Sequence, residues 1–491
     1  MKNSKSQRSV GTNVVLNIVK SVSQLFLPLI TYPYLLRVLG VENIGKVSYG
    51  AAIISYFSLF AVLGTNTYAV REGSRIRDDK NKINEFASQI FFINVIFSFF
   101  SYILLILLIL FDDGLNSYKL LLLIQSVGVV SSAISFEWVN SVFEDYLYIT
   151  LRSILVNLIQ IAVIFIFIHK RSDYYWYAGI QTSAVLLVSF INWIYCKRYI
   201  SITVVRDFEF AKHIKSLFVL FSNNIAVQIY MNIDTVMLGI LTTDRSVGLY
   251  SAATKIYSLV KNILASIYIV PLSRMSYYYA NGKKSELKRL YTNIVSFLSI
   301  IIIPAATGMF VLAKGLMYLL GGPEYFNATF TLKVLSISFI FALYGGVITQ
   351  CYNIVMRRER INLQATTLSA IIDFGINLLV IRRFEYNGAA FTTLLAEAFV
   401  LIYCFIKIPN KKELFVWKDV ISSFMNALIG AITIIFVSFI LQFFVQNLVI
   451  YTFFVTIISA VIYFIELIIL KDKTLNRVLS QFLRIYKLKS K

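Results

Sequence analysis

Residues 87–111 read ASQIFFINVIFSFFSYILLILLILF, a run of 25 residues that contains no charged side chain. An α-helix rises about 1.5 Å per residue, so this run is long enough to cross the hydrocarbon core of a bilayer, which is about 30 Å thick. The stretch therefore predicts a transmembrane helix.

Similar apolar stretches recur along the whole chain. Only 14% of its 491 residues are charged and 58% are hydrophobic, whereas soluble proteins carry about 25% charged residues. The sequence therefore predicts an all-α polytopic membrane protein with about 14 transmembrane helices. The candidate spans are 12–36, 44–70, 87–111, 118–139, 151–168, 175–195, 215–241, 247–272, 290–313, 329–355, 364–381, 387–406, 419–443 and 447–470.

Lysine and arginine are distributed unequally between alternate ends of these spans. With the N-terminus inside, 33 of the 46 basic residues fall on the inner side and nine on the outer side. Cytoplasmic loops are enriched in basic residues, and a missed span would scramble this bias. Both termini are predicted to be cytoplasmic. The basic inner loops are expected to contact anionic lipid head groups, so the net charge of +21 does not indicate a nucleic-acid partner.

Residues for enzymatic chemistry are not grouped in the sequence. His169 and His213 are isolated near span ends, no GxxxxGK[ST] motif occurs, and every connection between spans is short. We predict that the chain is not an enzyme, holds no cofactor and is a secondary transporter. Cys196, Cys351 and Cys404 are widely separated in or beside apolar runs and are interpreted as packing residues.

Polar side chains inside the spans mark candidate substrate-binding positions. A charge at the centre of a membrane helix costs about 2.5–3.5 kcal/mol on insertion scales, so it normally faces a cavity or a partner. Two of these residues have another interpretation. The side chain of Lys20 could extend to the membrane interface, and Asp234 could neutralise a lysine of span 8. The candidate set is Asn17, Lys20, Gln24, Asn224, Gln228, Asp234, Lys255 and Lys261.

Two acids lie deep in the C-terminal half, Asp373 in span 11 and Glu397 in span 12. A carboxylate in the membrane is disfavoured in its charged form unless it has a partner. Each is therefore interpreted either as the partner of a lysine or as a protonatable group that couples transport to a proton or sodium gradient.

A weak internal repeat links the two halves of the chain. Leu39-Gly40 is followed by Gly45-x-x-Ser48, and Leu238-Gly239 by Gly248-x-x-Ser251, about 200 residues later. Transporters commonly consist of two such halves with the binding site at their interface. The predicted organisation is an N-terminal lobe (1–200), a C-terminal lobe (201–410) and a final pair of spans with a basic tail (411–491).

Three segments of the chain carry a resemblance to a known family. Residues 64–72, GTNTYAVRE, contain the pattern Gly-x-x-x-Tyr-x-x-Arg-Glu at the end of span 2. The other two are the run from Trp138 to Arg152, between spans 4 and 5, and residues 173–177 at the start of span 6. These segments resemble the corresponding ones of Wzx-type polysaccharide repeat-unit flippases of the multidrug/oligosaccharidyl-lipid/polysaccharide exporter superfamily. The chain departs from the pattern at Asp373, where such proteins often have asparagine.

The resemblance implies two pseudo-symmetric six-helix lobes in a V around a cationic central cavity, with two extra C-terminal helices. It implies alternating access that moves an undecaprenyl-diphosphate-linked oligosaccharide from the inner to the outer leaflet of the bacterial cytoplasmic membrane. The product would feed capsule or O-antigen assembly, with a polymerase and glycosyltransferases as partners. The lysines and amides of the candidate set suit a diphosphate and sugar hydroxyls.

Three other functions stay open at this point. A flippase for a peptidoglycan precursor or a teichuronic-type polymer would share the fold and differ in the sugar. A multidrug antiporter of the same fold would favour acidic and aromatic cavity residues. A membrane-embedded glycosyltransferase or polymerase would need a large outer loop or catalytic carboxylates.

Overall fold

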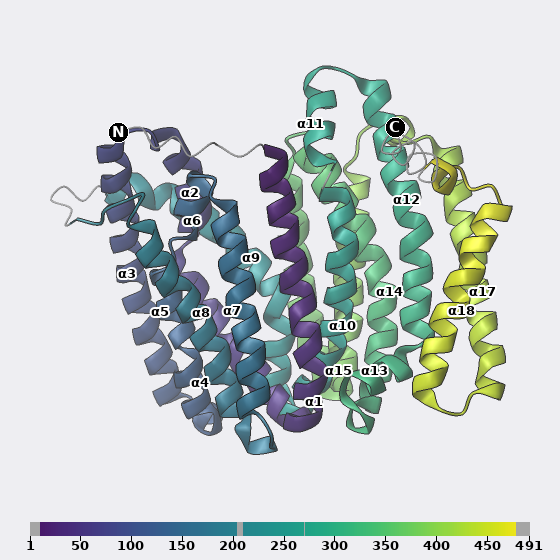
Figure 1. Ribbon diagram of the computed structural model, residues 1–491, viewed down its shortest axis with the longest axis horizontal. Coiled ribbons are helices and arrows are strands. Elements are labelled where there is room, and N and C mark those ends of the chain that lie inside the picture. Colours follow the sequence, from purple (N-terminus) through teal and green to yellow (C-terminus); the bar gives the residue numbers. More distant parts are fainter. Residues whose placement is uncertain (1–9, 204–209, 270, 478–491) are drawn as a thin grey trace, which may run out of the picture. The chain divides into compact units, whose positions relative to one another are not determined.

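The computed structural model describes residues 10–203, 210–269 and 271–477, and their side chains except those of 10–28, 210–212, 215, 223, 269, 412 and 413. Within these ranges all regular secondary structure is helical (Figure 1). Twelve of the helices described are long and apolar enough to cross a membrane. The predicted all-α polytopic membrane fold is confirmed.

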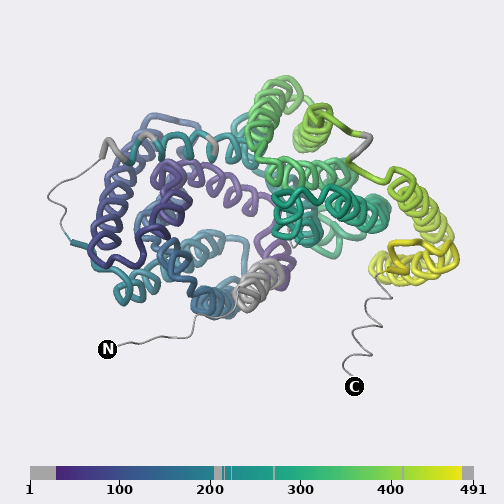
Figure 2. The backbone as a smooth tube through the Cα atoms, turned by 90° about the horizontal axis from the view of Figure 1, so that it is seen from above, coloured from purple at the N-terminus to yellow at the C-terminus, as the bar shows by residue number. Residues whose placement is uncertain are grey.

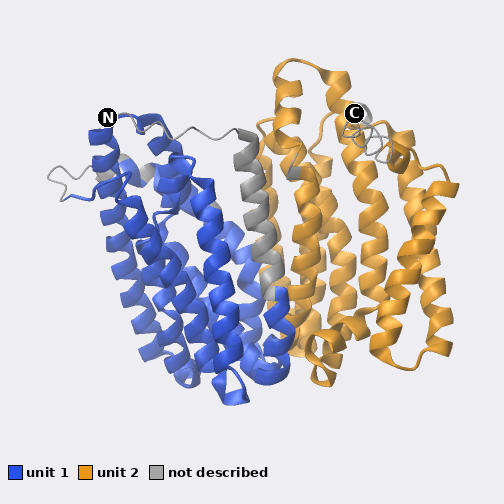
Figure 3. Ribbon diagram, in the orientation of Figure 1, with its two compact units in different colours: residues 1–248 blue, residues 249–491 orange. Residues whose placement is uncertain are grey.

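The chain divides into two compact units, residues 1–248 and 249–491 (Figure 3). The division falls near the start of helix α10, and the three-part organisation bounded at residues 200 and 410 stays a prediction. Unit 1 holds α1 (Val10–Val62), α2 (Thr65–Ile76), α3 (Lys80–Phe111), η1 (Asp113–Tyr118), α4 (Lys119–Gln125), α5 (Val127–Ala133), α6 (Glu137–Val142), α7 (Tyr146–Phe167), η2 (Arg171–Asp173), α8 (Tyr174–Cys196), α9 (Phe210–Leu241) and the start of α10 (Asp244–Ile269).

Unit 2 continues from α10 to the C-terminal pair of long helices. Figure 2 shows α17 and α18, in yellow-green and yellow, at the edge of this unit. Here α17 packs on α12, and α18 packs on α17 and α13. The elements are α11 (Leu272–Ala280), α12 (Lys284–Val311), α13 (Ala313–Gly321), η3 (Pro323–Ala328), α14 (Thr329–Gly346), the π-helix η4 (Val347–Ile354), α15 (Glu359–Ile406), α16 (Lys411–Leu414), α17 (Trp417–Phe444) and α18 (Leu448–Ile469).

Two of the twelve candidate membrane helices are 48 residues long and reach into two predicted spans each. A straight helix of that length would measure about 72 Å, more than twice the hydrocarbon thickness. The helical backbone is interrupted at Gly40 (φ 77°, ψ 170°) in α1 and at Glu385 (φ 47°, ψ −132°) in α15. Each interruption separates two predicted spans. Two of the twelve candidate helices therefore correspond to two predicted spans each, which accounts for the predicted number of about fourteen.

The apolar run of residues 87–111 lies in α3. Asp79 caps this helix by accepting hydrogen bonds from the backbone N–H groups of Asn81 and Lys82. One face of α3 is buried in unit 1, whereas Phe99, Phe111 and several leucines are exposed. An apolar exposed face is expected where a helix contacts lipid tails.

Glycines of the internal repeat meet inside unit 1. A Cβ atom on Gly45 would lie 1.8 Å from the carbonyl oxygen of Asp244, and one on Gly248 would lie 2.0 Å from the carbonyl oxygen of Val41. Only glycine permits two backbones to approach this closely, as at other small-residue contacts between membrane helices. The repeat thus marks a packing contact in which each copy supplies one glycine.

The three cysteines are free thiols inside the protein. Cys196 is 1% exposed, and Cys351 and Cys404 are 0% exposed. Each contacts neighbouring helices or backbone carbonyls, as with the Cys351 thiol and the carbonyl oxygen of Tyr268 at 3.3 Å.

Candidate functional site

Unit 1 contains a cavity of about 680 Å³ among α1, α4, α5, α6, α7 and α8. In the described part of the chain, eleven of the eighteen residues that line it are polar or charged. Polar side chains at membrane depth are unfavourable in contact with lipid and normally line a water-filled space or a binding site. The polar residues are Ser55, Ser58, Gln125, Ser132, Glu137, Arg152, Ser153, Asn157, Gln160, Gln181 and Thr182.

The sequence of α7 explains why this helix supplies much of the lining. Ser153, Asn157 and Gln160 follow one another at steps of four and three residues, so they share one helical face. Leu151 and Leu155, on other faces of α7, are 57% and 59% exposed. The helix therefore turns a polar face inward and apolar faces outward, the reverse of a helix in a soluble protein.

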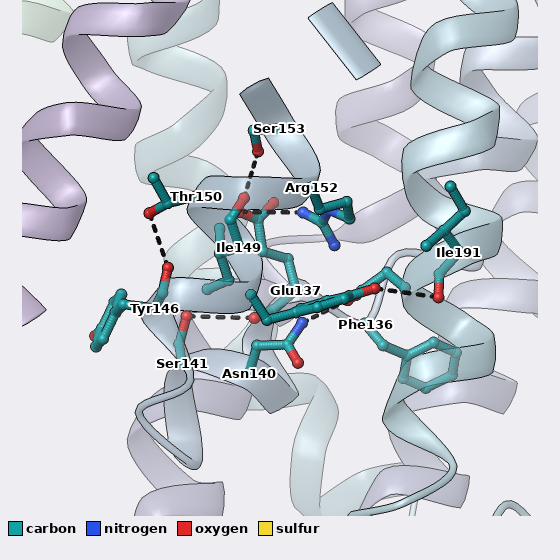
Figure 4. A network of polar contacts seen from close by, with 12 residues as sticks. Phe136, Glu137, Asn140, Ser141, Tyr146, Ile149, Thr150, Arg152, Ser153 and Ile191 are labelled. Carbon is teal, nitrogen blue, oxygen red and sulfur yellow. Dashed lines mark hydrogen bonds and ion pairs between the residues drawn. The ribbon is translucent and has the colours of Figure 1, made fainter. Parts of the chain in front are cut away.

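Arg152 is a cation in the wall of this cavity, and it is almost entirely buried. Its side chain is 4% exposed, and its Nη2 atom lies 3.9 Å from the Oε1 atom of Glu137 on α6 (Figure 4). The Nε and Nη1 atoms are buried and have no hydrogen-bond partner among the described residues. A guanidinium has five N–H donors, and a buried charge whose donors are unmatched is costly. The arginine can therefore receive an anionic group from the cavity.

Arg152 belongs to a helix that is long and apolar enough to cross a membrane. It lies in the candidate span Tyr146–Phe167, six residues and about 9 Å from the first residue of α7. The ring of Tyr148 lies 5.4 Å from its guanidinium carbon, and the Tyr148 hydroxyl donates to the Ile191 carbonyl of α8. Tyr148 is thus anchored to α8, and its ring packs beside the Arg152 guanidinium in the cavity wall.

The turn between α6 and α7 is held by ionic and aromatic contacts. Arg77 bonds to Glu144 at 2.9 Å, and Glu144 itself adopts a positive φ of 56°. The Asp145 carboxylate accepts a hydrogen bond from Tyr199 at 2.8 Å and a second one from Tyr195. The run from Trp138 to Arg152, noted above for its family resemblance, thus fixes the entry of α7 and the position of its arginine.

The motif at the end of span 2 also has a structural role. Gly64 has a φ of 74° and precedes α2, a backbone conformation that glycine adopts without strain. The Tyr68 hydroxyl lies 2.8 Å from Nδ1 of His213, whose Nε2 contacts Gln89. His213 is therefore part of a buried network that links α2, α3 and α9.

The sequence-predicted residues of unit 1 do not line this cavity where the structure describes them. The side chains of Asn17, Lys20 and Gln24 lie outside the described residues. On α9, Asp234 is buried, and Asn224 and Gln228 are half-buried. None of these α9 residues lines the cavity. Their roles in substrate binding stay predictions.

Two of the predicted residues meet in unit 2. The Nζ atom of Lys261 on α10 lies 2.6 Å from Oε1 of Glu397 on α15, and the Tyr257 hydroxyl donates to the same oxygen at 3.0 Å. Glu397 is thus the partner of a membrane lysine. Lys255 is half-buried on α10 and Asp373 is buried on α15. A part for any of these groups in binding or ion coupling stays a prediction.

Sequence reasoning missed Arg152 as a site residue. Arg152 is the second residue of the predicted span 151–168, and it was counted with the basic residues of the inner connection before that span. Its polar face on α7 was readable from Ser153, Asn157 and Gln160, which recur at helical spacing. This spacing identifies the polar face of α7, but it does not show which other helices that face contacts.

A family model described as "Polysaccharide biosynthesis protein" matches residues 10–276, more than half of the chain. The chain belongs to this family. The resemblance to polysaccharide repeat-unit flippases is therefore confirmed.

Two proteins are similar to the chain in sequence, and a third is similar to it in fold. The "Putative O-antigen transporter" of Escherichia coli (strain K12) is 27% identical over 83% of the chain and 98% of its own length. The "Probable low-salt glycan biosynthesis flippase Agl15" of Haloferax volcanii is 22% identical over 44% of the chain and 47% of its own length. Lipid II flippase MurJ, in an inward closed conformation, has the same fold, with a TM-score of 0.74 and 16% identity over 94% of the chain and 99% of MurJ.

Proposed function

We propose that this protein is a flippase for an undecaprenyl-diphosphate-linked oligosaccharide in the bacterial cytoplasmic membrane. The observation that carries the proposal is Arg152, a buried guanidinium of a candidate membrane span in the wall of a polar cavity. Two of its nitrogen atoms have no hydrogen-bond partner among the described residues. The family match and the transporters among its relatives support a lipid-linked polysaccharide cargo.

The chemistry of the cavity suits such a cargo. Guanidinium groups bind phosphate oxygens through paired, charge-assisted hydrogen bonds. The serine hydroxyls and the amides of Asn157, Gln160 and Gln181 can donate to and accept from sugar hydroxyls. In this proposal the saccharide and its phosphates pass through protein, while the polyprenyl chain stays in lipid.

The finer parts of the proposal concern direction and pathway. The cargo moves from the inner to the outer leaflet by alternating access, and both termini face the cytoplasm. The product feeds surface polysaccharide assembly, in which glycosyltransferases supply the cargo and a polymerase consumes it. The protein itself carries out no bond chemistry in this scheme.

Two other cargoes are compatible with the fold. A peptidoglycan precursor would present the same diphosphate to Arg152 and differ only in its sugars. A cationic drug would instead need the carboxylate of Glu137, which already lies 3.9 Å from Arg152. Competition between the three cargoes in one assay separates these functions.

The test replaces Arg152 in proteoliposomes that contain a fluorescent undecaprenyl-diphosphate oligosaccharide. Arg152→Gln is expected to slow flipping about ten-fold or more, since a hydrogen bond to a charged group is worth about 1.5–3 kcal/mol. Arg152→Lys should retain part of the rate, because it keeps the charge and loses the paired donors. The matched control is Arg245→Gln, which removes an exposed arginine of unit 1 that does not line the cavity.

A second variant separates binding from folding. Arg152→Gln removes a cation that lies 3.9 Å from the Glu137 carboxylate. Arg152→Gln combined with Glu137→Gln therefore keeps this pair neutral and of similar volume. If the double variant folds and flips cargo at the wild-type rate, the proposal is wrong. Transport of cationic drugs at a rate independent of Arg152 would favour the antiporter.

A further inference from the structure

A second cavity, of about 290 Å³, lies in unit 2 among α11, α12, η4 and α16. Its walls include the rings of Tyr278, Tyr279, Tyr291 and Tyr352. Two lysines, Lys284 and Lys288, complete its polar side. Its described lining residues all belong to unit 2 and include neither Lys261 nor Glu397.

The lining of this cavity is drawn from one end of the membrane helices of unit 2. One candidate span ends at Ala280, the next begins at Lys284, and a third ends at Ile354, beside Tyr352. Asn410 and Leu414 lie between the spans Glu359–Ile406 and Trp417–Phe444. In Figure 1, α11 and the start of α12 stand together at this end of unit 2. The ends of membrane spans are expected at the level where lipid head groups meet the hydrocarbon, and tyrosine is enriched at that level.

The two lysines give this cavity a positive rim. Lys284 and Lys288 are four residues apart, so they lie on one face of α12 and at its N-terminal end, where the helix dipole also favours an anion. Among the lining residues whose side chains the structure describes, none carries a carboxylate. The charge of the rim is complementary to a phosphate.

The floor of the cavity is apolar and buried. Leu287 is 5% exposed and Leu414 and Tyr352 are each 8% exposed. The Tyr291 hydroxyl already donates to the Cys351 carbonyl at 2.7 Å, so this ring presents only its apolar surface. A free inorganic anion would leave such a floor uncovered, whereas an amphiphile with a phosphate would cover both parts.

We propose that this cavity binds an anionic phospholipid of the surrounding membrane. Lys284 and Lys288 contact the phosphate, and the tyrosine rings and Leu287 contact the glycerol and the first part of an acyl chain. The bound lipid would link α11 to α12 and α16 at the membrane surface. The proposal does not depend on which cargo the protein carries.

The test measures lipid retention by the full-length protein in detergent after delipidation, with phosphatidylglycerol or phosphatidylcholine added back. Native mass spectrometry counts the bound lipids. Each lysine near a membrane surface strengthens binding of anionic lipid about five-fold. Lys284→Gln with Lys288→Gln is therefore expected to weaken binding of phosphatidylglycerol about 25-fold, and binding of phosphatidylcholine should not change.

The control removes the same charge from the same segment. Lys283 and Arg289 flank the two lysines, are exposed and do not line the cavity. Lys283→Gln with Arg289→Gln should therefore leave binding within about two-fold of wild type. Equal losses in the two double variants would show nonspecific surface attraction and overturn the proposal.

Two competitors identify the source of the phosphate. Millimolar inorganic phosphate that displaces the lipid would show a site for free anions and overturn the proposal. Preferential retention of undecaprenyl phosphate over phosphatidylglycerol would make the cavity a cargo site instead, which also overturns it. Retention of phosphatidylglycerol in the presence of both competitors is the expected result.

Discussion

Two membrane-embedded cations of this protein differ in what neutralises them. Lys261 has a close carboxylate partner at 2.6 Å, whereas the nearest carboxylate atom to Arg152 is 3.9 Å away. The sequence indicated Lys261 and Glu397 separately, because charges within apolar runs are easy to see. The sequence did not show that they pair, because the two residues are 136 positions apart. Helical periodicity indicates which residues share a face, but not which helix that face contacts.

Breaking the Lys261–Glu397 pair should destabilise the fold. Removing one partner of a buried pair strands the other charge, which typically costs about 3–5 kcal/mol. Lys261 is one quarter exposed, so we expect Glu397→Gln to lower the unfolding free energy by about 2 kcal/mol. The exchange Lys261→Glu with Glu397→Lys should restore most of it. Thermal unfolding in detergent measures both variants.

The same variant tests the other interpretation of the acids. If Glu397→Gln keeps wild-type stability and flipping no longer responds to an imposed pH gradient, Glu397 is a coupling group and not a structural partner. Asp373→Asn is examined in the same proteoliposomes. A wild-type protein that ignores every gradient would mean that neither acid couples transport to ions.

At the scale of helices, close backbone contacts decide how the elements of unit 1 pack. Gly45→Ala and Gly248→Ala would each place a methyl group 1.8–2.0 Å from a carbonyl oxygen. We expect each to lower the unfolding free energy by about 1–3 kcal/mol, because the helices must move apart. Thermal unfolding and the yield of folded protein measure the effect.

Two helical glycines elsewhere serve as controls for this prediction. A Cβ atom on Gly308 in α12 or on Gly375 in α15 would meet no atom within 4 Å. Alanine is the better helix former by up to about 1 kcal/mol, so these substitutions should be neutral or stabilising. Equal losses at all four positions would mean that the contact between Gly45 and Gly248 is unimportant.

For the whole molecule, hydropathy and charge predicted most of the fold. The span 447–470 corresponds to α18, Leu448–Ile469, within a residue at each end. The breaks at Gly40 and Glu385 were placed between spans, although only the structure shows a merged α1 and α15. The cavities were not predictable, because a cavity depends on how several helices pack and no single helix encodes that.

The 33-to-9 distribution of basic residues predicts the orientation of the whole chain, with both termini in the cytoplasm. Alkaline phosphatase inserted after Gly114, in the connection between α3 and α4, should be active in a bacterial host, because this connection is predicted to be periplasmic. The same enzyme inserted after Gly282, between α11 and α12, should be inactive. Activity in the reverse pattern would invert the topology and place both termini outside.

The burial of the three native thiols has a practical consequence for spectroscopy. Since Cys196, Cys351 and Cys404 are at most 1% exposed, a water-soluble maleimide should leave the folded wild-type chain unmodified. A single cysteine introduced on either side of the membrane would then be the only labelled position without any further engineering. Pairs of such labels would report distance distributions during transport in a protein that keeps its own packing.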